Sequence, residues 1–148
     1  MSKELTLKDV IEVAYANAVK FMQYDQPIEE FQKVKHECDL GKLEGAIRAA
    51  FQTSEGKYLI GGFYMRASAL FYYLSKAHAL VNGNKRLAVT SLMVFMVKNK
   101  KWINMPDKEL IELSIMIASS DRKVKDTTIE LVAGKIKKFS VSSAKMPK

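Results

Sequence analysis
This sequence has very few cysteines and histidines and no long apolar run. Its one cysteine, Cys38, cannot form an intramolecular disulfide, which favours a reducing, cytoplasmic setting. His36 and Cys38 are too few for a zinc site, which takes about four ligands. No apolar run approaches the roughly 20 residues of a membrane-spanning helix, and residues 1–4 lack the features of a signal peptide. We therefore expect a cytoplasmic protein that does not engage a membrane.

Hydrophobic residues are plentiful, at 48% of the 148 residues, which is enough to build a core over most of the chain. We expect a single domain over residues 1–140 and a loose polar tail over residues 141–148. The net charge of +8 suits an acidic partner such as a nucleotide or a nucleic acid. Many of these charges lie in residues 98–101 and the C-terminal third, where a solvated basic face is the simpler interpretation.

Start and stop signals divide the first half of the chain into helices. Thr6 with Asp9 predicts the start of a first helix, which we expect to end near Gln23. Pro27 suits the first turn of a short second helix, reaching about residue 35. Asp39 is placed to cap a third helix.

Apolar positions at helical spacing predict which side chains are buried. These expected core positions are Val10, Ala14, Ala18, Phe21, Leu43, Ala46, Ile47, Ala50, Leu110, Leu113 and Ile117. Pro106 and Asp107 open the helix that carries the last three. Thr127 with Glu130 predicts a capping box for a last helix over residues 129–139. Trp102 is expected to fold back on the core.

Residues 87–97 are almost wholly apolar, which predicts a helix buried on all sides. Before it, residues 54–56 form a turn signal, residues 57–60 favour a strand, and Gly61–Gly62 breaks the structure. A short hairpin fits this segment, and a plain connecting loop is the alternative. We predict an all-α fold, a helical bundle around a buried central helix, with one short β-hairpin.

A polar segment, residues 82–86, lies between two apolar helical segments. The first amides of a helix have no partner within the helix and carry partial positive charge, so they bind anions. Gly83 allows a ligand to approach the backbone closely, and Asn84 tolerates left-handed backbone. Lys85 and Arg86 add positive charges at a helix start, where an anion makes them favourable. The residues support a phosphate site, and a plain Asn-Gly turn followed by solvated cations is the alternative.

His78 follows Leu74 by one helical turn, so we expect its side chain to continue the inward face and to lie near this loop. A neutral imidazole takes up a proton near physiological pH, so it can serve as the base that activates a hydroxyl nucleophile. A histidine at the edge of the core, bonded to a carbonyl, is the structural alternative.

The segment resembles the motif of the Fic/Doc family (filamentation-induced-by-cAMP and death-on-curing proteins), His-x-Phe-x-acid-Gly/Ala-Asn-Gly/Lys-Arg. The residues that match it in register are His78, Gly83, Asn84, Lys85 and Arg86. Residues 39–46, 92–99 and 109–118 resemble family helices that flank the flap and the motif. The resemblance covers most of residues 4–140. Lys85 stands where AMP-transferring members have Gly, so the chain looks closer to the death-on-curing branch.

This resemblance implies a Fic-like enzyme that transfers a phosphoryl or nucleotidyl group from ATP to a protein Thr or Ser hydroxyl. It implies His78, Lys85 and Arg86 as catalytic residues. The implied phosphate-binding residues are Asn82, Gly83, Asn84, Lys85 and Arg86. A Mg²⁺ ion would lie at Asn82, the position of the family's acidic metal ligand. An amide oxygen is a weaker ligand for this cation, so a catalytically silent binding module is the alternative.

Partners are implied as well. The hairpin corresponds to the family's flap, and Tyr58, Leu59 and Ile60 are expected to contact the target protein as an added strand. The chain has no copy of the family's inhibitory Ser/Thr-x-x-x-Glu-Gly/Asn helix. A toxin-like protein of this kind would be restrained by a separate antitoxin chain. Two further differences from the family are Leu80 in place of its Phe and Val89 in place of a second Arg.

Two other classes of function are less well supported. A nucleic-acid binder needs Lys and Arg clustered on one recognition helix. The most regular pattern on the predicted helices here is instead formed by apolar residues. A hydrolase built on Ser75, Lys76 and His78 lacks the strand–turn–helix motif that exposes a nucleophilic serine. We therefore do not expect nucleic acid as a partner.

Overall fold

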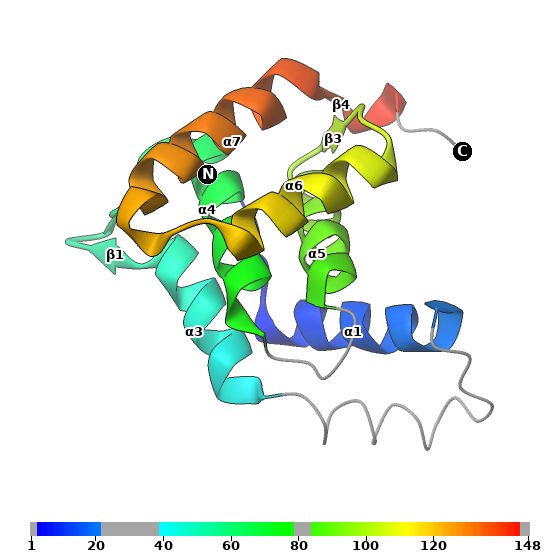
Figure 1. Cartoon of the computed structure of the whole chain (residues 1–148). Coiled ribbons are helices and arrows are strands. Elements are labelled where there is room, and N and C mark those ends of the chain that lie inside the picture. Colours follow the sequence, from blue (N-terminus) through cyan, green and yellow to red (C-terminus); the bar gives the residue numbers. More distant parts are fainter. Residues whose placement is uncertain (1–2, 22–38, 79–83, 146–148) are drawn as a thin grey trace.

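The computed structural model describes residues 3–21, 39–78 and 84–145 (Figure 1). Its helices are α1 (Leu7–Phe21), α3 (Leu40–Phe51), α4 (Phe63–Ala77), α5 (Asn84–Lys98), α6 (Asp107–Ser119) and α7 (Lys125–Phe139). Its strands are β1 (Thr53–Ser54), β2 (Lys57–Tyr58), β3 (Lys101–Ile103) and β4 (Ser140–Ser142), and two 3₁₀ turns are η1 (Arg122–Val124) and η2 (Ser143–Lys145). The predicted all-α fold with a short β-hairpin is confirmed. The predicted end of the first helix at Gln23 and the short helix over residues 27–35 lie outside the described residues.

Two antiparallel helices share the centre of the molecule. The predicted central helix, α5, buries Ala88, Leu92, Phe95 and Met96 completely and packs against α1, α4 and α6. The α4 helix contacts α3, α5, α6 and α7, so it occupies the centre as well. Its inward side chains include Leu70, Phe71 and Leu74. The core is therefore built around a pair of helices rather than a single one.

The predicted starts of α1 and α3 are confirmed. The Thr6 amide donates to Asp9 Oδ2 over 2.9 Å, and the Asp9 amide donates to Thr6 Oγ1 over 3.1 Å. Asp39 Oδ1 accepts from the Lys42 amide over 3.1 Å. Each carboxylate satisfies backbone donors that the first helical turn leaves without a partner. The expected core positions whose side chains the structure describes are buried, except Ile47, which is half-buried against the core.

The C-terminal segment differs from its prediction in two ways. The loose tail expected from residue 141 is wrong for residues 141–145, because Val141 pairs with Trp102 in the β3–β4 ladder and η2 follows. The last helix begins at Lys125, so Thr127 and Glu130 lie inside α7 and form no capping box at its start. Asp121 instead caps the short η1 turn, where it accepts from the Lys123 amide over 2.9 Å.

The hairpin β1–β2 joins α3 to α4. Its turn residues, Glu55 and Gly56, both have positive φ, at 53° and 78°. A turn of this hand matches the twist of two short antiparallel strands, and Gly56 adopts it without a steric penalty. Because α3 and α4 run antiparallel on either side of the hairpin, they bring two separate groups of residues together at their two ends (Figure 1).

We name these two regions by what they contain. The hairpin end holds the hairpin, the start of α4 and the C-terminal part of α5. The loop end holds the start of α3, the end of α4 with His78, the start of α5, and the end of α6. The 15 residues of α4 span about 22 Å at about 1.5 Å per residue, which separates the two ends.

Candidate active site at the loop end

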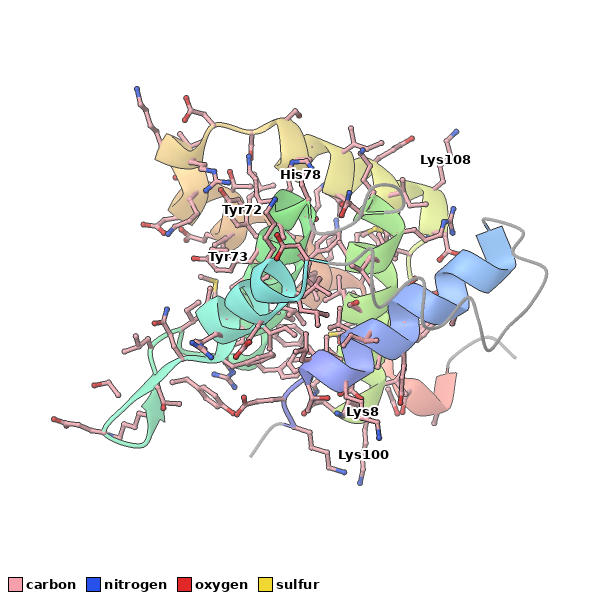
Figure 2. All side chains as sticks on the ribbon, turned by 90° about the horizontal axis from the view of Figure 1, so that it is seen from below. Lys8, Tyr72, Tyr73, His78, Lys100 and Lys108 are labelled. Carbon is pink, nitrogen blue, oxygen red and sulfur yellow. The ribbon has the colours of Figure 1, made fainter. Side chains whose placement is uncertain are left out.

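His78 terminates α4 and is exposed to solvent. Its backbone is left-handed, with φ 49° and ψ 43°, so the α-helical hydrogen-bond pattern stops there. The expected inward orientation in line with Leu74 is wrong, because this backbone takes the side chain off the buried stripe of α4. Figure 2 shows His78 at the end of α4, away from Lys8 and Lys100. An accessible imidazole can meet an incoming hydroxyl group.

The start of α5 lies at the same end of the molecule. Lys85 is exposed, and Asn84 and Arg86 are half-buried. The first turn of α5 contains no acidic residue. Its amides and its two cations therefore give this helix start a positive character. Asn82 and Gly83, the other predicted phosphate ligands, lie outside the described residues.

The structure therefore brings together the two described parts of the predicted site. Since α4 and α5 pack against each other in antiparallel directions, the end of α4 and the start of α5 are neighbours. His78, Lys85 and Arg86 belong to this region, as their sequence spacing requires. The arrangement combines a possible base with groups that attract an anion.

The hairpin does not join this site. Tyr58 is half-buried, its hydroxyl donates to Glu4 Oε2 over 3.0 Å, and the Arg66 guanidinium lies 4.3 Å from its ring centroid. Ile60 also packs against the core, whereas Leu59 is 58% exposed. Of the three residues expected to contact a target, Leu59 alone faces solvent freely. All three lie at the opposite end of α4 from His78.

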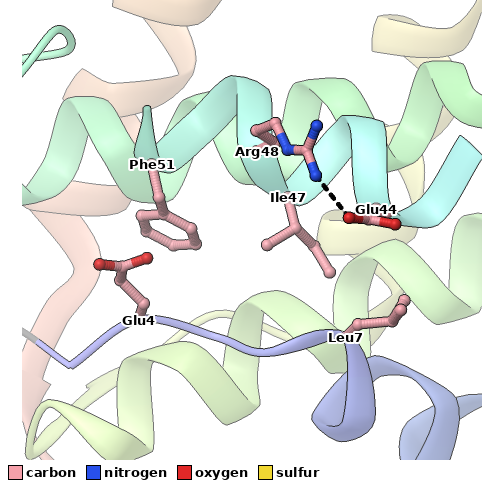
Figure 3. Close-up of a pocket in the computed structure, with 6 residues that line it drawn as sticks. All are labelled: Glu4, Leu7, Glu44, Ile47, Arg48 and Phe51. Atoms are coloured by element: carbon pink, nitrogen blue, oxygen red, sulfur yellow. Dashed lines mark hydrogen bonds and ion pairs between the residues drawn. The ribbon is translucent and has the colours of Figure 1, made fainter. Parts of the chain in front are cut away.

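A shallow hollow of about 250 Å³ lies beside the hairpin end, between the N-terminal segment and α3 (Figure 3). Leu7, Ile47 and Phe51 supply its apolar surface, and Glu44 forms an ion pair with Arg48 at its edge. Glu4, which also lines it, already accepts the Tyr58 hydroxyl. The polar groups here are paired within the protein, so this hollow carries no sign of a charged ligand.

The serine hydrolase alternative is not supported. The Ser75 hydroxyl is buried and shares a hydrogen bond of 2.8 Å with Ser114. Lys76 Nζ donates to the carbonyls of Ala118 and Ser120 at the end of α6. Ser75 is therefore closed to substrate and Lys76 is engaged elsewhere, so with His78 they form no catalytic triad.

The described residues contain no group of three His, Cys, Asp or Glu side chains that could hold a metal ion. The first turn of α5 supplies no carboxylate oxygen, the ligand that Mg²⁺ prefers. No helix in the described ranges is long and apolar enough to span a membrane.

The structure brings three cations together between α3, α4 and η1, namely Lys42, Lys76 and Arg122, a grouping that the sequence did not predict. They are 80 positions apart along the chain at most, and no local motif marks them. Comparison with known proteins gives no further assignment: no family model matches the chain, and no curated protein or solved structure matches it.

Proposed function
We propose that this protein is a Fic/Doc-like enzyme that transfers a phosphoryl or nucleotidyl group from ATP to a Thr or Ser hydroxyl of another protein. The observation that carries the proposal is the junction of α4 and α5. An exposed histidine ends one helix, and the next helix begins six residues later with two cations and no carboxylate in its first turn. This order of groups fits the motif that the sequence resembles.

In the proposed reaction, the nucleotide phosphates lie over the start of α5. Its amides and Arg86 donate hydrogen bonds to phosphate oxygens, and Lys85 adds a mobile positive charge. The target oxygen attacks phosphorus while His78 takes the hydroxyl proton. The bond to the leaving group breaks, releasing ADP after phosphoryl transfer or pyrophosphate after nucleotidyl transfer. Positioning and stabilisation of phosphate charge supply the catalysis.

No step of this scheme is assigned to a metal ion, because the first turn of α5 supplies no carboxylate ligand. Asn82, outside the described ranges, is the one position that the family resemblance offers. The same substitution of an amide for an acid supports the alternative function, a catalytically silent module that binds a nucleotide or a protein without turnover.

The hairpin has a smaller role in this proposal than the resemblance implies. A protein bound at Leu59 must extend about 22 Å along α4 before its hydroxyl reaches His78. We therefore assign the hairpin a distal docking role, with the reacting segment held at the loop end. A separate antitoxin also belongs to the proposal, because it follows from the Fic/Doc resemblance, and so does a cytoplasmic location, which the single cysteine favours.

The test is transfer of label from ATP to protein. The purified chain is incubated with cell lysate and ATP carrying the label on either the α or the γ phosphate. Label from the γ position identifies a kinase, and label from the α position identifies a nucleotidyl transferase. His78→Ala should abolish labelling while leaving the thermal unfolding midpoint unchanged, because His78 is exposed.

A matched pair of charge variants locates the nucleotide. Arg86→Gln should weaken ATP binding, whereas Lys108→Gln, an exposed position at the start of α6, should not. ATP binding without labelled product supports the silent module. Labelling that survives His78→Ala, or an absence of any ATP binding, would contradict the proposed enzyme.

A further inference from the structure
A second hollow, of about 290 Å³, lies at the loop end between α3, α4 and η1. Small residues make part of its lining, namely Gly45, Ala46 and Ala77. A side-chain carbon built at Gly45 would meet no other atom within 4 Å, apart from its own helix backbone and its chain neighbours. Glycine and alanine at these positions therefore leave open space next to the last turn of α4.

Three cationic side chains line this hollow, each from a different element: Lys42 of α3, Lys76 of α4 and Arg122 of η1. No carboxylate is among its lining residues in the described part of the chain. Lys76 is held in place, since its Nζ donates to the Ala118 and Ser120 carbonyls at the end of α6. Its positive charge is therefore fixed at the wall of the hollow.

The acidic residues next to these cations in the sequence are already engaged. Asp39 caps α3 through the Lys42 amide, and Asp121 caps η1 through the Lys123 amide. The ion pairs found among the described residues, Asp9–Lys98 and Glu44–Arg48, include none of the three cations. Folding thus gathers positive charges here without an ion-paired carboxylate, which favours an anionic ligand from outside.

Two tyrosines and a fourth cation extend this region. Lys125 Nζ lies 5.7 Å from the Tyr73 ring centroid, and the hydrogen bond between them raises the pKa of Lys125, so this lysine stays charged. The Tyr72 hydroxyl is buried and has no hydrogen-bond partner among the described residues. Burial raises its pKa, while the charges of Arg122 and Lys125 act in the opposite direction. It stays protonated at neutral pH and keeps an unused donor near these cations.

We propose that this hollow binds one or two phosphate groups of a small anionic ligand, next to the site of His78. Arg122 offers a planar fork that suits phosphate oxygens, Lys42 is a mobile charge, and Lys76 is a fixed one. The same phosphate chemistry is found in inorganic pyrophosphate and in the tail of a nucleotide. The inference stands whether or not His78 is catalytic.

The test is a titration of the full-length chain with inorganic pyrophosphate, followed by amide NMR. Gly45 supplies a reporter inside the hollow, and its amide signal should shift and saturate. A parallel titration with ATP compares the two sources of phosphate. If the Gly45 amide signal reports tighter binding of ATP than of pyrophosphate, the hollow is assigned to a nucleotide tail, and if it reports equal binding, the hollow is assigned to free phosphate anions.

Two variants test the hollow, one by filling its space and the other by removing one of its charges. Gly45→Leu fills the space and changes no charge, and it replaces a helical glycine with a better helix former, so the fold is retained. Arg122→Gln removes the guanidinium group. Gly45→Leu should weaken pyrophosphate binding by occupying the space of the ligand, and Arg122→Gln should weaken it by about tenfold, the usual effect of losing a charge-assisted contact. Lys108→Gln, at the far end of α6 from Ser120, is the matched charge control and should bind as the wild type does.

Three results would overturn the inference. The first is a titration that does not saturate. The second is wild-type affinity in both Gly45→Leu and Arg122→Gln, together with loss in Arg86→Gln, which would place the phosphate on the start of α5 instead. The third is equal weakening by Lys108→Gln, which would reduce the effect to overall charge. None of these outcomes depends on group transfer, so they are separate from the labelling test of His78.

Discussion
The two ends of the α3–α4 pair differ in whether their charged side chains are paired with one another. At the hairpin end, Asp9 forms an ion pair with Lys98 over 2.6 Å and the Tyr58 hydroxyl donates to Glu4. At the loop end, Lys42 of α3, Lys76 of α4 and Arg122 of η1 line one hollow, and none of the ion pairs found among the described residues includes them. The charges at the hairpin end are thus balanced within the protein, whereas the hollow at the loop end keeps an excess of positive charge.

Packing follows the same division. The Phe95 ring lies 5.2 Å from that of Phe63 and 5.3 Å from that of Phe51, measured between ring centroids, and its side chain is fully buried. At the loop end, Tyr73 is half-buried beside an open hollow. Phe95 at the hairpin end is thus more completely buried than Tyr73 at the loop end. Substitutions of Phe95 and of Tyr73 should therefore lower the free energy of unfolding by different amounts.

The largest expected effect is on stability at the hairpin end. Phe95→Ala should lower the free energy of unfolding by about 3–5 kcal/mol, because it removes a fully buried ring and leaves a cavity among the other two aromatics. Tyr73→Ala should cost less than half of this, since Tyr73 borders a hollow. Urea unfolding of both variants measures the difference. Equal losses would mean that the loop end is packed as tightly as the hairpin end.

An intermediate effect on stability is expected from the ion pair between Asp9 and Lys98 at the hairpin end. Burial alone would raise the pKa of Asp9, but hydrogen bonds from Lys98 and Thr6 outweigh it, and the pKa falls below its ordinary value of 3.8. A carboxyl group whose pKa is lower in the folded state adds stability above that ordinary value. This stability is lost as the pH falls through the folded pKa.

Asp9→Asn should therefore lower the free energy of unfolding by about 1–2 kcal/mol at pH 7, through loss of the cap and the ion pair. The difference between variant and wild type should shrink in acid, below about pH 4. Urea unfolding at pH 7 and at pH 3 measures it, with Asp107→Asn as a control at an exposed carboxylate. A difference that stays constant with pH would show that the charge of Asp9 contributes nothing.

Local signals in the sequence predicted the local features of this fold. The Thr6–Asp9 box, the Asp39 cap and the buried stripe of α6 each depend on residues within a few positions of one another, and all three are present. The apolar run of residues 87–97 predicted the helix α5 and most of its burial, but not burial on all sides, since Val97 is 39% exposed.

What the sequence missed depends on contacts between distant residues. The β3–β4 pairing joins Trp102 to Val141, and neither segment has a strand pattern of its own. The distance between the hairpin and His78 depends on the length and direction of α4, which spacing along the chain does not reveal. The cationic hollow needs Lys42, Lys76 and Arg122 to meet in space. Predictions of a shared site fail most readily where one long helix separates its parts.

The smallest expected effect tests the comparison most directly, because it uses two cations on one helix. Arg48 of α3 faces the hairpin end and pairs with Glu44, whereas Lys42, in the first turn of α3, faces the cationic hollow. Arg48→Gln should lower the free energy of unfolding by about 0.3–0.5 kcal/mol, the usual contribution of an exposed pair at this spacing. Lys42→Gln should raise it by a few tenths of a kcal/mol, since it relieves repulsion from Lys76 and Arg122 and an unfavourable helix dipole.

Urea unfolding of the two variants at low and high salt measures this difference in sign. Both effects should fade at about 1 M salt, where charges are screened within about 3 Å. Without an anion, Lys42→Gln should be more stable than the wild type. With pyrophosphate, the wild type should become the more stable of the two, because the bound anion stabilises its folded state more than that of the variant. If the two substitutions have the same sign in the absence of any anion, the loop end carries no excess of repulsion, and its cations are ordinary solvated surface.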